Sequence, residues 1–177
     1  MIRRARQDDA AALAAIYTPY VERTWISFEE VPPSANDMLV KLLAGIQTYP
    51  WLVEEHNGEV RGYAYGGVHR GRPAYRWSVE TTIYLAEDAR GQGLGKRLYT
   101  DLIATLKRQG FRSAFAGIAL PNPASVALHE RVGFTSFGVF SAVGFKLGAW
   151  RDVGWWRLGL NESGEPLPDP IPFSKLD

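Results

Sequence analysis

Apolar side chains recur at every third or fourth position in two stretches of the first fifty residues. This spacing places them on one face of a helix. The first stretch follows two aspartates that can cap a helix and ends near Glu22; the second begins at Ser34, with Asp37 three residues on as a weaker capping box. The apolar positions are Leu13, Ile16, Tyr17 and Tyr20, then Met38, Leu39, Leu42, Leu43 and Ile46. We therefore predict two amphipathic helices joined by an aromatic loop, 23–33.

Extended segments rich in aromatic and β-branched residues follow these helices. The segments 51–55 and 60–67 flank Asn57-Gly58, a pair that tolerates positive φ in a tight turn, so they form a predicted hairpin. The long run 74–85 is the predicted central strand. Further strands are predicted at 111–120, 134–143 and 150–160, with a short basic strand at the N-terminus.

Two more helices are indicated by glycines at their ends. One opens in the run Arg90 to Gly95, carries Leu94, Leu98, Leu102 and Leu106 in register, and stops at Gly110. The other spans 122–132 and is closed by Gly133. Four helices interleaved with strands in this order predict an α/β fold around one mixed sheet.

Composition narrows the class of protein. With 177 residues, 46% of them hydrophobic, the chain has the size of one compact domain, predicted at 1–162. The segment 163–177 is a proline-rich tail that we expect to lie along the surface. A net charge of +1 gives no field that would attract nucleic acid or a membrane surface, so we expect a small-molecule partner.

The chain contains no cysteine, which excludes disulfides, thiolate metal sites and a cysteine-bound acyl intermediate. Its three histidines, His56, His69 and His129, are too scattered to predict a metal site. The N-terminus lacks a signal-peptide pattern and no apolar run is long enough to span a bilayer. We therefore expect a cytoplasmic protein.

The run Arg90 to Lys96 places a glycine-rich turn directly before a helix, where backbone N–H groups and the helix dipole favour phosphate. The alternative is a tight turn without a ligand. A Walker loop is excluded because arginine stands at positions 90 and 97, where glycine and Ser or Thr are needed. A dinucleotide fingerprint is excluded because Lys96 replaces its third glycine.

The sequence of this loop does match the pattern Arg/Gln-x-x-Gly-x-Gly/Ala, with Arg90, Gly93 and Gly95 at the defined positions. In this motif the chain resembles the GNAT superfamily of N-acetyltransferases. The order of elements agrees along nearly the whole chain. The resemblance implies a mostly antiparallel sheet with a splayed strand pair, where acetyl-CoA binds with its pyrophosphate on the loop and its pantetheine arm along the preceding strand. The implied cofactor-binding residues are Ile83, Tyr84, Leu85, Arg90, Gly91, Gln92, Gly93, Leu94, Gly95, Lys96 and Asn122.

Acetyl transfer to an amine needs a proton acceptor, because a free amino group is largely protonated near neutral pH. Glu80 is the best placed carboxylate, three residues upstream of the predicted pantetheine strand. The alternative is a glutamate on a solvated face that pairs with a strand neighbour such as Arg76.

The departing thiolate needs a proton donor. The superfamily commonly has tyrosine in the segment 122–134 where this chain has His129. Together with Glu80 and the segment 144–150, this histidine resembles the phosphinothricin and methionine sulfoximine acetyltransferases, which implies Glu80 and His129 as a catalytic pair and a homodimer. The alternative is a histidine that only packs. With no cysteine, direct attack in a ternary complex is the simplest route.

An acceptor of this class carries a carboxylate and an oxidised phosphorus or sulfur group, which need cationic or hydroxyl partners. We expect the Leu85 N–H or a neighbouring amide to polarise the thioester carbonyl. The loop 24–29 is a candidate wall of the acceptor pocket, with simple packing as the alternative. The segment 153–156 is a candidate dimer contact, with a buried strand as the alternative. The candidate acceptor-binding residues are Arg72, Tyr75, Arg76 and Lys146.

Two other functions remain open from the sequence. One is acetylation of protein N-termini or lysines, for which acidic residues near the acceptor would be expected. The other is a sensor that binds CoA without chemistry. The leading hypothesis is acetyl transfer from acetyl-CoA to the amino group of a small amino acid analogue.

Overall fold

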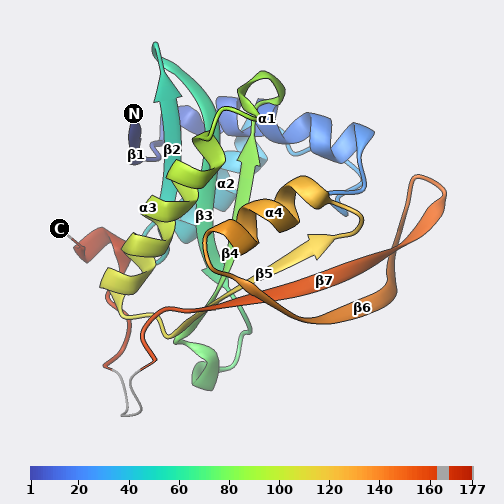
Figure 1. The fold of residues 1–177 in the computed structure, drawn as a ribbon. Helices are drawn as coiled ribbons and strands as arrows, with labels where there is room; N and C mark the ends of the chain where they lie inside the picture. Colours follow the sequence, from blue (N-terminus) through green and yellow to red (C-terminus); the bar gives the residue numbers. More distant parts are fainter. Residues whose placement is uncertain (163–167, 177) are drawn as a thin grey trace.

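The computed structural model describes residues 1–162 and 168–176, which form one seven-stranded sheet covered by two helices on each face (Figure 1). The strand order is β1-β2-β3-β4-β5-β7-β6, and neighbours are antiparallel except β4 and β5. The strands are β1 (Ile2–Arg4), β2 (Trp51–His56), β3 (Glu59–Val68), β4 (Ser78–Leu85), β5 (Ser113–Ala119), β6 (Thr135–Lys146) and β7 (Ala149–Gly159). The helices are α1 (Ala10–Arg23), α2 (Ala35–Gly45), α3 (Leu94–Gln109) and α4 (Pro123–Arg131). The mixed, mostly antiparallel fold is confirmed.

The core lies in two layers, one on each face of the sheet. Alternate side chains of a strand point to opposite faces. Accordingly Trp51 and Val53 pack against α1 and α2, whereas Leu52 packs against α3. The apolar face predicted for the second helix is confirmed only in part, since Met38 and Leu42 are buried but Leu43 is exposed.

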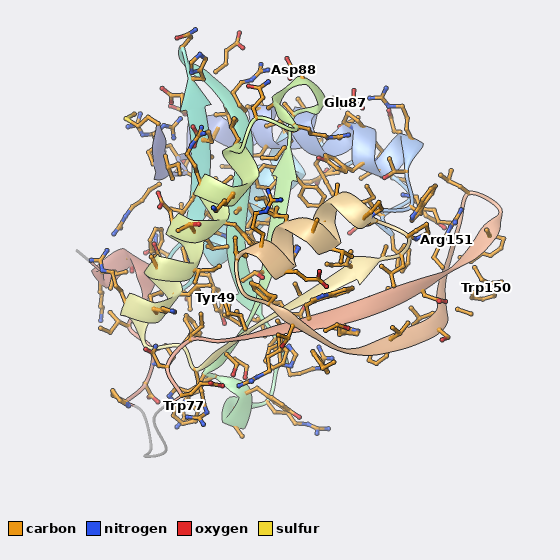
Figure 2. The ribbon with its side chains drawn as sticks, in the orientation of Figure 1. Tyr49, Trp77, Glu87, Asp88, Trp150 and Arg151 are labelled. Carbon is orange, nitrogen blue, oxygen red and sulfur yellow. The ribbon has the colours of Figure 1, made fainter. Side chains whose placement is uncertain are left out.

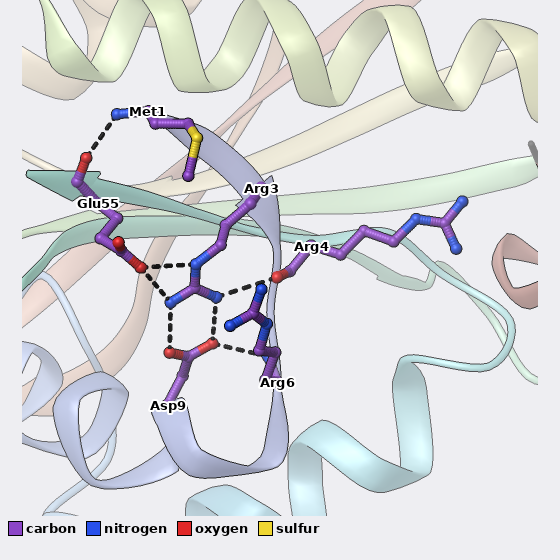
Figure 3. Close-up of polar contacts among 6 residues, drawn as sticks. All are labelled: Met1, Arg3, Arg4, Arg6, Asp9 and Glu55. Atoms are coloured by element: carbon purple, nitrogen blue, oxygen red, sulfur yellow. Dashed lines mark hydrogen bonds and ion pairs between the residues drawn. The ribbon is translucent and has the colours of Figure 1, made fainter. Parts of the chain in front are cut away.

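The helix starts differ in how they are stabilised. Ser34 caps α2 with the predicted capping box to Asp37. Asp9, in contrast, precedes α1 without capping it, because its carboxylate accepts hydrogen bonds from the Arg3 guanidinium at 2.8 Å. Arg3 also donates to Glu55 at 2.7 Å, so this cluster ties β1 to both α1 and β2 (Figure 3).

The predicted central strand is shorter than expected. Residues 73–75 form a single 3-10 turn, and β4 begins only at Ser78. Proline fixes φ near the helical value and favours the first position of such a turn. Arg76 holds the turn by donating to the Pro73 carbonyl at 3.1 Å.

The splayed strand pair is formed by β4 and β5. They pair only from Ser78 opposite Ser113 to Glu80 opposite Phe115, and β5 then continues along β7. The Ala86 N–H donates to Arg61 on the β3 side, and peptide groups alternate along an antiparallel strand. The peptide groups of Thr81, Ile83 and Leu85 therefore face the gap that opens between β4 and β5.

The described part of the tail, 168–176, does not simply lie on the surface. Phe173 is only 3% exposed and joins the core beside α3. Its N–H donates to the Thr48 carbonyl at 3.1 Å, and the Ile171 N–H donates to the Gln109 carbonyl at 2.7 Å. The prolines predicted a segment along the surface but gave no sign of this anchor.

Candidate active site

A cleft of about 460 Å³ lies between the loop 24–29, β4 and the β5–β7 pair, and Glu80 forms part of its wall. A narrower slot of about 100 Å³ adjoins it and is lined by Ile83, Asn122, Ser125 and His129. The two share several lining residues, namely Ile26, Thr81, Thr82, Tyr84, Gly117 and Ala119. Cleft and slot are therefore parts of one continuous gap, with Glu80 at one end and His129 at the other.

A larger cavity of about 720 Å³ runs along α1 and the β2–β3 hairpin, but neither Glu80 nor His129 lines it. Its charged wall is mainly acidic, with Asp8, Glu59, Glu87 and Asp88. Such a wall would repel the phosphates of CoA. The β4–β5 gap is therefore the better candidate for the active site.

Glu80 projects from β4 with its side chain 32% exposed, so that it is open to the cleft. Its Oε1 accepts hydrogen bonds from His69 Nδ1 and from the Arg70 guanidinium, both at 3.1 Å. Both partners follow β3, whose Gly67 lies opposite Glu80. The carboxylate is held in place by these two groups, and not by Arg76.

His129 is 3% exposed and sits on α4 with both ring nitrogens engaged. Nδ1 lies 2.7 Å from the Ser125 carbonyl, which can only accept, so we assign the proton to Nδ1. Nε2 then accepts from the Tyr99 hydroxyl at 2.9 Å, and that hydroxyl also lies 2.5 Å from Thr81 Oγ1. A hydrogen-bonded chain thus joins α4, α3 and β4 beside the slot.

Burial lowers the pKa of His129 below its ordinary value, because a desolvated imidazolium is disfavoured. An unfolded chain would therefore take up a proton near pH 6.5 that the folded protein resists, so this group contributes stability above that pH and loses it as pH falls through the lowered pKa. We expect the melting temperature of the wild type, relative to His129→Gln, to be higher at pH 7.5 than at pH 5.5. A difference between the two proteins that stays constant with pH would contradict this assignment.

The glycine loop has the geometry that a pyrophosphate requires. Gly91 and Gly93 adopt positive φ of 75° and 78°, and the first intrahelical bond of α3 runs from the Arg97 N–H to the Gly93 carbonyl. The N–H groups of Leu94, Gly95 and Lys96 therefore have no partner within the helix. They lie at the positive end of the helix dipole, where an anion is stabilised.

Close packing around the start of α3 also favours glycine at position 95. A Cβ there would lie 3.2 Å from the Leu85 side chain and 3.3 Å from that of Leu128, so the residue allows α3 to start close to β4 and α4. Of the other loop residues, Gln92 donates to the Asp88 carbonyl at 2.7 Å and the Arg90 guanidinium lies 4.7 Å from the Tyr20 ring.

Ile83 and Tyr84 line the slot, whereas Leu85 differs from expectation. The Tyr20 hydroxyl donates to the Leu85 carbonyl at 2.7 Å and accepts from the Leu85 N–H at 3.2 Å. Leu85 therefore does not supply a free amide for the thioester carbonyl. The peptide group of Ile83, two residues earlier on the same edge of β4, is the neighbouring amide that faces the gap. Asn122, which caps α4, also lines the slot.

Three of the predicted acceptor-binding residues do not line the cleft. Arg76 donates to Asp169 at 2.6 Å and stacks on Trp77 at 3.8 Å, which directs it toward the tail. Arg72 and Tyr75 are exposed in the turn before β4, and the Tyr75 ring lies 5.9 Å from the ring of His69. The expectation for this group is corrected, because the 3-10 turn carries it away from the β4 edge.

Lys146 is also unsuited to binding the acceptor. It is 8% exposed, and its ammonium donates three hydrogen bonds to backbone carbonyls. The groups that the sequence did not single out are His69 and Arg70, beside Glu80, and Tyr99, beside His129. Two basic side chains in a row, His69 and Arg70, directly after the hairpin strand could have been noticed as candidate site residues. The alignment of β3 with β4 that brings them to Glu80 could not be deduced from the sequence.

Among the described residues, no cluster of three potential metal ligands is present. No helix within residues 1–162 and 168–176 is long and apolar enough to cross a membrane.

Comparison with known proteins agrees with this geometry. The phosphinothricin N-acetyltransferase of Streptomyces viridochromogenes is 40% identical over 167 residues, covering 94% of this chain and 91% of that protein. The L-methionine sulfoximine/L-methionine sulfone acetyltransferase of Salmonella typhimurium is 36% identical over 166 residues, covering 93% of this chain and 97% of that protein.

Solved structures show the same relationship. A phosphinothricin acetyltransferase from Sinorhizobium meliloti, in complex with acetyl-CoA, superposes with a TM-score of 0.91 at 35% identity, covering 99% of this chain and 97% of that one. A ribosomal-protein-alanine N-acetyltransferase from Brucella melitensis superposes with a TM-score of 0.85 at 35% identity, covering 90% of this chain and 99% of that one. A family model described as an acetyltransferase (GNAT) domain matches residues 2–155. This chain therefore belongs to the GNAT family and is an acetyl-CoA-dependent N-acetyltransferase.

Proposed function

We propose that the enzyme acetylates the amino group of a small amino acid analogue such as phosphinothricin or methionine sulfoximine, by direct attack in a ternary complex. The observation that carries this proposal is the continuous gap between β4 and β5, with a carboxylate at one end and a buried histidine at the other. The names of the relatives support the acceptor class. The lack of cysteine in the chain leaves no thiol that could carry the acetyl group in between.

Glu80 is the proposed base. It takes a proton from the ammonium of the acceptor, either directly or through one water, which frees the nitrogen lone pair to attack the thioester carbon. Arg70 and His69 keep the carboxylate directed at the cleft. The Ile83 N–H is the proposed donor to the carbonyl oxygen as negative charge develops on it.

His129 is proposed to serve the thiolate that leaves when the carbon–sulfur bond breaks. A thiol has an ordinary pKa of about 8.5, so the thiolate can take up the proton that the attacking nitrogen releases as it becomes an amide. Neither ring nitrogen is free, but the Ser125 hydroxyl lines the slot and lies 3.3 Å from Nδ1. We therefore place Ser125 between His129 and the sulfur: the neutral imidazole keeps its proton and orients the Ser125 hydroxyl, which donates a hydrogen bond to the thiolate.

Recognition of the acceptor is assigned to the cations nearest the cleft. The Arg70 side chain is half-exposed, lies beside Glu80, and reaches within 5.9 Å of the Trp155 ring that forms part of the cleft wall. A guanidinium binds a carboxylate or phosphinate through paired hydrogen bonds. Arg70 is thus the proposed partner of the acceptor anion in place of Arg72 and Arg76.

A second candidate is acetylation of a protein N-terminus, which the likeness to the Brucella melitensis enzyme favours. The discriminating experiment measures release of CoA thiol with phosphinothricin, methionine sulfoximine, methionine and a peptide that begins with alanine. We expect release with the amino acid analogues and little with the peptide. The opposite ranking would assign the enzyme to peptides, and acetyl-CoA binding without any release would indicate a sensor.

We also propose a homodimer, and a cytoplasmic location in keeping with the intracellular co-substrate. The expected contact segment 153–156 is mostly covered, because Trp156 is buried and Trp155 faces the cleft. A group of exposed apolar side chains lies instead on the β6–β7 ribbon, which projects from the body in Figure 1. They are Phe137, Val139, Phe140, Val143, Phe145, Leu147 and Trp150.

An apolar patch of this kind on an edge strand is typical of a protein interface. Sedimentation or light scattering is expected to give twice the chain mass of 19.7 kDa. Replacing Phe140 by glutamate should shift the protein toward the monomer. A wild type that is monomeric at micromolar concentration would overturn the dimer proposal.

A further inference from the structure

Lys146 is the last residue of β6, and its ammonium is saturated by the backbone of another part of the chain. Nζ donates to the carbonyls of Val21 at 2.6 Å, Ser27 at 2.7 Å and Glu29 at 2.6 Å. An ammonium has three protons, so these three bonds use all of them. Burial lowers the pKa of this lysine, but the three carbonyl dipoles favour the charged form.

Two of the three carbonyls belong to residues that line the acceptor cleft, and the third lies at the end of α1. Val21 lies in the last turn of α1, where carbonyls lack an intrahelical partner and attract a cation. Ser27 and Glu29 lie in the segment 24–29, which we call the acceptor loop, and both line the cleft. One side chain from the ribbon therefore fixes the end of α1 and the acceptor loop at once.

Two further contacts hold the ribbon against the same loop. A Cβ on Gly144 would lie within 2.3 Å of the Phe28 ring, so this ring rests directly on the β6 backbone. The Arg151 guanidinium, on β7 in the outer part of the ribbon in Figure 2, lies 4.2 Å from the Trp25 ring. Ribbon and loop thus touch at three successive points.

We propose that Lys146 is a positioning residue that holds the acceptor loop against the cleft and thereby sets the affinity for the acceptor. This inference rests on the proposed function, which places the acceptor in the cleft beside Glu80. The lysine touches no part of the β4 edge or of the glycine loop. Its effect should therefore be confined to the acceptor side of the reaction.

The test is Lys146→Met, which keeps the length of the side chain but removes the three donors. With phosphinothricin as acceptor, we expect its KM to rise by about 10-fold or more, with kcat at saturation within about threefold and the KM for acetyl-CoA within about twofold. Lys107→Met, at an exposed position on α3, is the matched control and should change neither KM. Gly144→Ala, which displaces Phe28 without removing a charge, should raise the KM of the acceptor in the same way.

Hydrogen exchange supplies a readout that does not depend on activity. Amides in 24–29 should exchange faster in Lys146→Met than in the wild type, while those of α3 keep their protection. If the wild type proves inactive on every acceptor but exchange in the loop still rises, the positioning role stands and the proposed function fails. If the wild type is active and the variant leaves the acceptor KM unchanged, or lowers kcat and raises both KM values together, the inference is overturned.

Discussion

Replacing Glu80 by glutamine is expected to lower kcat by about 10²-fold or more. The amide keeps the size and hydrogen-bonding length of the carboxylate but cannot take a proton from the ammonium of the acceptor. The binding of acetyl-CoA, measured by calorimetry, should stay within about twofold, since Glu80 lies at the cleft end of the gap and not beside the glycine loop. The rate is measured as release of CoA thiol at saturating acceptor.

The matched control is Glu59→Gln. Glu59 is an exposed carboxylate in the β2–β3 hairpin, paired with Arg61 at 3.3 Å, and its loss should leave kcat unchanged. Partial activity that recovers in Glu80→Gln as pH rises would fit a missing base, because more of the amine is then neutral without help. A variant with wild-type kcat at neutral pH would remove Glu80 from the mechanism.

The second large effect is expected for His129→Ala. Loss of the imidazole removes the group behind Ser125 and leaves the Tyr99 hydroxyl without its acceptor, so kcat should fall by about 10²-fold. Because the ring is buried, stability should fall as well, and the melting temperature and acetyl-CoA affinity must be measured on the same sample.

Two variants separate chemistry from packing. His56→Ala, an exposed histidine at the hairpin, is the control and should be silent. Tyr99→Phe keeps the buried ring and removes only the hydroxyl that bonds Nε2, so it should lose stability with a much smaller loss of kcat. If Tyr99→Phe and His129→Ala reduced kcat equally, His129 would act through the integrity of the chain of hydrogen bonds and not by orienting Ser125.

Much of the fold was predictable because its signals are local. The hairpin turn appears in the structure with Asn57 and Gly58 at positive φ of 51° and 82°, and Gly110 ends α3 at 90°. The missed detail, the turn before β4, depends on Pro73 and on side-chain contacts of Arg76. One of those contacts, from Arg76 to Asp169, joins residues 93 positions apart in the sequence, so no local pattern predicts it.

Site residues could be predicted from the sequence where a single strand or helix start fixes their position. Glu80 and His129 were both proposed from the sequence, and the structure brings them to one gap. The residues on the acceptor side could not be predicted, because their position depends on how neighbouring strands of the sheet are aligned. Arg70 reaches Glu80 only because Gly67 pairs with Glu80, and Lys146 is removed from the cleft by carbonyls more than a hundred residues earlier in the chain.

The central claim is direct acetyl transfer to a small amino acid analogue, and initial-rate kinetics test it most directly. Rates are measured while acetyl-CoA and phosphinothricin are varied together, and the product is identified by mass spectrometry. We predict one added acetyl group on the amine and double-reciprocal lines that intersect, as a ternary complex requires. Parallel lines, or no acetylated product from any amino acid analogue, would contradict the account.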